Sequence, residues 1–163
     1  MGYDSTFEGE FRISPPLNEA EMTYLHAFAR TRHMRTRLSP YNTTELDYAD
    51  GMVIDANEAP NGVPGLWCQW VPNDDGDAIV WDEGEKFYDS EEWIAWLIEH
   101  LLKPGAVAQQ KGDDRFVEFT FDHVVNGTVE VQGEEPADKW AIRVRDNVVS
   151  SAQGRVVYDD EEE

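Results

Sequence analysis

The fold of this chain is decided by the stretch Gly65-Leu66-Trp67-Cys68-Gln69-Trp70-Val71-Pro72 and the return segment Ala78-Ile79-Val80-Trp81. Leu66, Cys68 and Trp70 fall on one face of the first segment, with the period of two that a strand requires. Between the segments, residues 72–77 supply the Pro, Asn, Asp and Gly that favour tight reversals. The stretch therefore predicts a β-hairpin.

A helix is predicted directly after this hairpin. Asp89, with Glu92 three residues later, is a variant of the capping box that starts a helix. Pro104-Gly105 ends it. In between, apolar side chains recur at helical spacing and form one broad stripe: Trp93, Ile94, Leu97, Ile98 and Leu101. We expect this helix, residues 90–102, to cover the sheet.

Further elements are predicted on both sides of this stretch. Alternation predicts a strand at residues 7–13, and the cap pair Asn18 and Glu21 predicts a helix that runs to about Met34. Asn126-Gly127 predicts a hairpin turn, because both residues tolerate a positive φ. Alternation predicts strands at 115–125 and 139–145. We also expect strands at 52–54, 128–132, 148–149 and 155–158, with a two-residue turn at Asp146-Asn147.

These elements define the fold class and the domain organisation. They predict an α+β protein, with two helices packed on a mostly antiparallel sheet of hairpins. Residues 1–158 form a single domain, and the like-charge run 159–163 is expected to be a disordered acidic tail. Residues 38–65 are largely irregular, and long irregular segments are often functional.

Net charge restricts the classes of partner. The chain has 34 acidic and 13 basic side chains, a net charge of −21. Residues 1–37 hold five acids and five bases, so residues 38–163 carry the whole excess. Such a field repels nucleic acid and anionic membranes, so we expect neither to be bound directly. Basic partners, a basic protein above all, or cations are the natural candidates, and a role of the charge in solubility alone is the alternative.

Two charged clusters are candidate sites. The densest acids surround a single base, Lys86, and are the candidate partner-binding residues: Asp74, Asp75, Asp77, Asp82, Glu83, Glu85, Glu91 and Glu92. A basic cluster occupies the last turn of the first predicted helix and the position just beyond it, and consists of Arg30, Arg32, Arg35 and Arg37. Pairing with the helix dipole and with nearby acids explains part of this cluster. The alternative is an anion- or phosphate-binding site.

Signatures of catalysis and of cofactor binding are absent from the sequence. The Trp81–Tyr88 segment combines carboxylates with aromatic rings, as a hydrolase or carbohydrate-binding site does. A solvated acidic loop is the simpler interpretation. Residues 73–77 fail as a calcium loop, because Val71 occupies the first ligand position. The four histidines lack ligand spacing, and a lone Cys68 excludes a cysteine-based zinc site. We predict no cofactor, no metal and no catalytic residues.

Four segments resemble a family of small uncharacterised acidic proteins from tailed phages, prophages and actinobacteria. They are residues 65–72, residues 81–88 with the helix that follows, residues 31–35 and residues 126–134. The resemblance implies a phage or bacterial origin. Since the sequence has no run of 18 apolar residues and no signal-peptide pattern, we expect a cytoplasmic location in a bacterial host cell. It implies no activity.

These observations lead to one functional hypothesis and two alternatives. The leading hypothesis is a non-catalytic acidic protein that binds a basic partner, in its sharper form as a nucleic-acid mimic that inhibits a host nucleic-acid-binding protein. The first alternative is a hydrolase or carbohydrate-binding protein that uses the 81–88 loop. The second is a structural or accessory phage protein whose acidity serves only solubility. The oligomeric state is not predicted.

Overall fold

The structure is a computed structural model that describes residues 4–43 and 51–154. Its main sheet has six antiparallel strands in the order β4-β5-β1-β6-β7-β8, and β2 and β3 form a small second sheet. In chain order the elements are β1 (Thr6–Ser14), α1 (Glu19–Ala29), β2 (Arg35–Thr36), β3 (Val53–Asp55), β4 (Trp70–Pro72), β5 (Ala78–Trp81), α2 (Ser90–Leu97) with a π-helical turn (Ile98–Leu102), α3 (Val107–Lys111), a 3-10 turn (Asp114–Phe116), β6 (Val124–Gln132), β7 (Lys139–Arg145) and β8 (Val148–Gln153).

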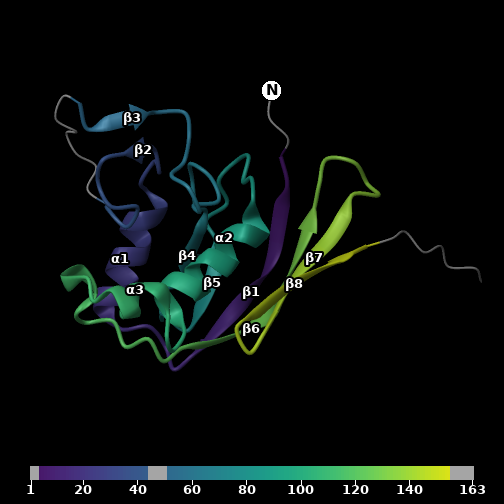
Figure 1. Ribbon diagram of the computed structural model, residues 1–163. Helices are drawn as coiled ribbons and strands as arrows, with labels where there is room; N and C mark the ends of the chain where they lie inside the picture. The colour runs from purple at the N-terminus through teal and green to yellow at the C-terminus, as the bar shows by residue number, and fades with distance from the viewer. Residues whose placement is uncertain (1–3, 44–50, 155–163) are drawn as a thin grey trace, which may run out of the picture.

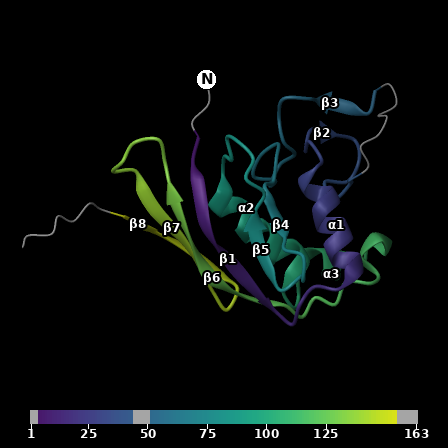
Figure 2. The same cartoon turned by 180° about the vertical axis from the view of Figure 1, so that it is seen from behind.

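The helices lie on one face of the main sheet (Figures 1 and 2). The side chains that β1 and β6 turn toward the helices are buried: Phe11, Ile13, Val125, Val129 and Val131. All five residues of the apolar stripe predicted for α2 and its π-helical extension are also buried. The α+β class, with helices on a mostly antiparallel sheet, is confirmed. Within the described residues, no helix is long and apolar enough to cross a membrane.

Trp93 lies at the centre of an aromatic cluster. Its ring packs edge-on against Phe28 and Trp96, with centroids 5.7 and 5.8 Å away, and tilted against His33 at 5.5 Å. Trp70 packs against Phe7, Phe11 and Phe87, and its indole N–H donates to the Ser90 carbonyl of α2 at 2.9 Å. Burial lowers the pKa of His33 to about 4, so the ring in this cluster is neutral.

The predicted helix boundaries need correction at two places. The capping box of Asn18 and Glu21 is confirmed, but α1 ends at Ala29 and not near Met34. The basic cluster therefore follows the helix and does not belong to its last turn. Asp89 precedes α2 in a left-handed conformation and makes no side-chain cap bond, so the predicted capping box is absent there.

The predicted hairpin at Asn126-Gly127 is wrong. Both residues lie inside β6, where Gly127 is opposite Phe11 of β1 and Val144 of β7. A Cβ on Gly127 would lie 2.4 Å from the carbonyl oxygen of Glu10, so close approach of two strands explains the glycine. The turn that joins β6 to β7 comprises residues 133–138.

The strand predicted at 115–125 begins only at Val124. Before it, the chain forms the 3-10 turn and an irregular segment in which Phe121 has a φ of 49°. The β4–β5 hairpin is confirmed, although β4 starts at Trp70, and the two-residue turn at Asp146-Asn147 is confirmed with both φ angles positive. The strand predicted at 155–158 and the tail at 159–163 lie outside the described residues.

Candidate functional site

The eight predicted acids do not form one cluster. Three lie in the β4–β5 turn, three in the loop after β5 and two in the first turn of α2. The β4–β5 turn lies at the end of β1, where Asp77 accepts a backbone hydrogen bond from Ile13. The loop after β5 lies at the start of β1, where the Lys86 N–H donates to Asp4 Oδ1 at 2.9 Å. Since β1 has nine residues, these two groups are roughly 27 Å apart.

The β4–β5 turn is built around Asn73. Its side-chain oxygen accepts from the N–H groups of Asp77 and Ala78, and its amide donates to Asp77 Oδ1 at 2.7 Å. Gly76 has a φ of 74° and packs so tightly that a Cβ would lie 2.8 Å from Met22 Sδ. Asp74, Asp75 and Asp77 are thus exposed positions on a structural turn. No group of metal-ligating side chains occurs within residues 4–43 and 51–154.

The loop between β5 and α2 holds an unusual backbone. Glu83, Lys86 and Asp89 have φ angles of 68°, 56° and 60°, a left-handed conformation that costs about 1–2 kcal/mol for each non-glycine residue. Bonds to the rest of the protein hold this conformation, among them one from the Gln69 amide to the Glu85 carbonyl at 2.8 Å. Asp82, Glu83 and Glu85 of this loop are exposed.

The aromatic side chains of this loop mostly face inward. Trp81 packs against Phe7 with 5.1 Å between ring centroids, and its N–H donates to Gln69 at 3.1 Å. Phe87 is buried among Phe7 and Trp70, and only Tyr88 is half exposed. The rings therefore do not form the exposed platform that a sugar would stack on.

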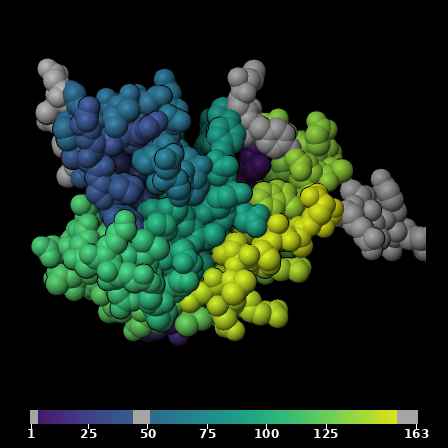
Figure 3. Space-filling model, in the orientation of Figure 1, coloured from purple at the N-terminus to yellow at the C-terminus, as the bar shows by residue number. Residues whose placement is uncertain are grey.

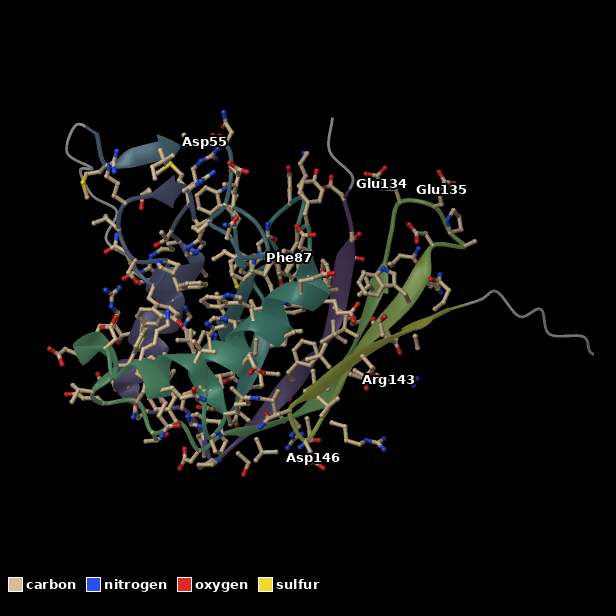
Figure 4. All side chains as sticks on the ribbon, viewed as in Figure 1. Asp55, Phe87, Glu134, Glu135, Arg143 and Asp146 are labelled. Atoms are coloured by element: carbon tan, nitrogen blue, oxygen red, sulfur yellow. The ribbon has the colours of Figure 1, made fainter. Side chains whose placement is uncertain are left out.

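Asp4 joins the loop after β5 to the β6–β7 turn. Its carboxylate accepts from Lys86, as described above, and its own N–H donates to Glu134 Oε2 at 2.7 Å. Figure 4 places Glu134 and Glu135 at the tip of the β6–β7 turn. We call the surface formed by these segments the acidic end, and its members are Asp4, Asp82, Glu83, Glu85, Glu134, Glu135 and Asp138.

Four members of the acidic end were not predicted from the sequence. Asp4, Glu134, Glu135 and Asp138 lie far from the dense run of acids, and Asp4 is 130 residues from Glu134. The only local signal was the polar, Gly- and Pro-containing composition of residues 133–138, which is typical of a turn. Pairing of β1 with β6, which brings the segments together, could not be predicted from local patterns.

A hollow of about 500 Å³ opens on the sheet below the acidic end. Its floor includes Ala141 and Ala152, which are directly opposite each other in the register of β7 and β8. Glu8 and Glu130, also directly opposite, continue the same row across β1 and β6. Like charges in that position disfavour pairing, so this row adds two carboxylates beside the acidic end at some cost in stability.

The arginine cluster binds a segment of its own chain. Arg32 donates to Ala56 and Asn57 at 3.1 Å, Arg35 forms an ion pair with Glu58 at 3.3 Å, and Arg37 donates to the Gly51 carbonyl at 2.8 Å. Arg30 caps the end of α1. Three of the four guanidinium groups therefore hold residues 51–58 in place, which accounts for most of the cluster without an anion. Binding of an anion stays a prediction.

Glu92 belongs to a different surface. It lines a groove of about 550 Å³ between residues 62–64 and α2, together with Trp96, Glu99 and His100. The ring of His100 stacks on Trp96 at 4.2 Å and approaches the Tyr41 hydroxyl at 2.8 Å. Burial lowers the pKa of His100, so this histidine adds no positive charge to the groove at neutral pH.

Comparisons with known proteins add no relative. No family model, no curated protein and no solved structure matches the chain. The resemblance to phage and actinobacterial proteins stays a prediction.

Proposed function

We propose that the protein is a non-catalytic binding protein that engages a basic protein partner through the acidic end. The observation that carries this proposal is the pair of hydrogen bonds made by Asp4. They hold two acidic loops side by side, so that the seven carboxylates outnumber the two bases beside them, Lys86 and Lys139. Charge of one sign on one surface steers an oppositely charged partner toward it.

The partner that fits this surface is a protein that normally binds nucleic acid. Carboxylates held on a folded scaffold can replace phosphates, because contacts to the phosphate backbone position a protein without reading sequence. The protein would then inhibit its partner by occupying the basic groove. The strained backbone of Glu83 and Lys86 supports this role, since strain of this kind is retained where a surface has a task.

The arrangement of the aromatic rings favours binding over hydrolysis. Trp81 and Phe87 pack into the core, so the Trp81–Tyr88 loop offers carboxylates without a stacking surface. The carboxyl group of Asp82, whose pKa is raised by partial burial, accepts a bond from the Gly84 N–H at 2.8 Å and shapes the loop.

Two variants with equal charge changes test the proposal. In the first, Asp82→Asn, Glu83→Gln and Glu85→Gln neutralise three carboxylates of the acidic end. In the second, Asp74→Asn, Asp75→Asn and Asp77→Asn neutralise three at the opposite end of β1. Both remove the same net charge, so only a local site distinguishes them. The immobilised proteins are exposed to a bacterial lysate, and retained proteins are identified by mass spectrometry.

We expect the unmodified protein and the second variant to retain the same basic protein, and the first variant to lose it. Added duplex DNA or RNA should release that protein, because it competes for the same groove. Equal retention by both variants would show that the acidic end is not the binding surface. Retention that neither DNA nor RNA reduces would contradict mimicry.

A further inference from the structure

The outer edge of β8 is an unpaired strand edge. β8 is the last strand of the main sheet, and no strand of the described segments pairs with its outer side. The opposite edge strand, β4, has only three residues, ends in Pro72 and lies beside α1, while α2 lies beside β8. Natural proteins protect exposed edges with charges, prolines or bulges. β8 has six residues, a regular register and neither a charge nor a proline.

Pairing with β7 determines which backbone groups point outward. The Gly154 N–H donates to the Lys139 carbonyl at 2.7 Å, so these two residues form a hydrogen-bonded pair. In an antiparallel ladder such pairs alternate with non-hydrogen-bonded ones. In the register of β7 and β8, the residues of β8 in non-hydrogen-bonded pairs are Val149, Ser151 and Gln153. Their N–H and C=O groups therefore face away from the sheet.

We propose that β8 pairs with the β8 of a second copy of this chain, antiparallel, about a two-fold axis at Ser151. The outward residues are symmetric about Ser151, so the strand is its own complement. Val149 of one copy lies opposite Gln153 of the other, and the two serines at position 151 face each other. A two-fold interface needs this self-complementarity, and the two sheets join into one.

The charge distribution favours this edge as the place where two copies meet. A net charge of −21 makes most of the surface repel a second copy. Residues 139–154 are the exception, with three bases and one acid: Lys139, Arg143, Arg145 and Asp146. β8 lies at the surface of the molecule (Figure 3), and pairing would cover Val148, which is 68% exposed. The β7–β8 hairpin itself therefore adds little to the repulsion between copies.

Sedimentation velocity from low micromolar to near-millimolar protein, at physiological ionic strength, tests the proposal. We expect the mass to rise with concentration to twice that of the chain. Ser151→Pro removes an outward N–H and leaves the bonds to β7 intact, so it should abolish the dimer without lowering Tm. Ser150→Pro is the matched control. It removes an N–H that faces β7, and it should lower Tm.

A charge swap tests the register. Ser151→Lys and Ser151→Glu should each lose the dimer, since equal charges would meet at the axis. A mixture of the two variants should restore it, because opposite charges pair across strands. A protein that stays monomeric at every concentration overturns the proposal. So does a dimer that survives either substitution, or a mixture that stays monomeric. The charge swap decides the question even where Ser151→Pro fails to fold.

Discussion

Glu21 of α1 and His123, 102 residues later in the chain, meet inside the protein with 2.9 Å between Oε2 and Nε2. Both side chains are fully buried. The other imidazole nitrogen of His123 lies 2.7 Å from the carbonyl oxygen of Pro15. Because both ring nitrogens face acceptors, the imidazole fits this place as a doubly protonated cation. The pair joins the start of α1 to the segment before β6.

The surroundings shift both pKa values toward the charged forms. Burial alone would raise the pKa of Glu21, but hydrogen bonds from His123 and from the Asn18 and Thr120 N–H groups lower it below 4.5. Burial alone would lower the pKa of His123, but its bonds to Glu21 and Pro15 raise it above 6.5, with a smaller contribution from the exposed Asp122 carboxylate 3.8 Å away.

The pair should therefore make stability depend on pH in two directions. The contribution of His123 is complete below about pH 6.5 and is lost as pH rises through its raised pKa. The contribution of Glu21 is complete above about pH 4.5 and is lost as pH falls through its lowered pKa. Together they stabilise the fold most between these values.

Glu21→Gln removes one partner and should lower the free energy of unfolding by about 3–5 kcal/mol, because His123 is left buried without its carboxylate. Urea unfolding from acidic to basic pH measures both the loss and the flattened pH profile. Glu19→Gln, on the exposed side of the same helix, is the control and should change neither. An unchanged profile in Glu21→Gln would contradict the assignment of the charged pair.

Trp93→Ala should cost about 3–5 kcal/mol, as large-to-small changes in a packed core do. Trp93→Phe should cost less than this, because the indole N–H of Trp93 is buried and has no hydrogen-bond partner among the described residues. Thermal unfolding measures both. Trp67→Ala, at a position 43% exposed, is the control and should change Tm little. Equal losses for Trp93→Ala and Trp67→Ala would contradict the packing of α2.

Gly127→Ala should destabilise the protein by about 2 kcal/mol or more, because its Cβ would meet the Glu10 carbonyl and its φ of 153° is strained for other residues. Gly62→Ala is the control. It also has a positive φ, of 84°, but no atom lies within 4 Å of the added Cβ. Denaturant unfolding separates the steric cost from the backbone cost. Similar losses in both variants would contradict the close approach of β1 and β6.

Gly127 also shows where sequence patterns stop being informative about the fold. The Asn-Gly pair has the chemistry of a hairpin turn. In the structure, however, Gly127 lies inside a strand, because β1, more than a hundred positions away, approaches β6 too closely for a larger side chain. Patterns that depend only on near neighbours, such as the Asn18–Glu21 capping box and the stripe of α2, were predicted correctly. The strand predicted at 115–125 failed because Phe121 takes a left-handed backbone that breaks the alternation.

The acidic end also combines residues that local sequence identifies with residues that only strand pairing brings together. Asp82, Glu83 and Glu85 could be identified from their density along the chain. Their neighbours across the sheet could not, since Asp4 and Glu134 are connected only by the pairing of β1 with β6. Density along the chain also misled, because Asp74, Asp75 and Asp77 lie at the other end of β1.

Glu83→Gly should stabilise the protein by about 1 kcal/mol, because glycine adopts the left-handed backbone at this position without the steric cost of a Cβ. Thermal unfolding measures the gain. Glu85→Gly is the control, since Glu85 has no positive φ, and it should not stabilise. If Glu83 helps to bind the partner, the same substitution weakens binding while it raises Tm. A drop in Tm for Glu83→Gly would contradict the strained conformation of the loop.

Binding of the partner should weaken steeply as salt is raised. The carboxylates of the acidic end are on the surface, and exposed charges act over a Debye length of about 8 Å at physiological ionic strength and about 3 Å at 1 M. Kd values measured by calorimetry over a series of salt concentrations give a slope for each variant. Neutralising Asp82, Glu83 and Glu85 should reduce that slope, whereas neutralising the acids of the β4–β5 turn should leave it nearly unchanged. The fold tolerates both sets, since surface changes usually stay within about 0.5 kcal/mol each. A partner that binds equally well in high salt and to the neutralised acidic end would show that another surface, such as the apolar groove beside Trp96, makes the contact.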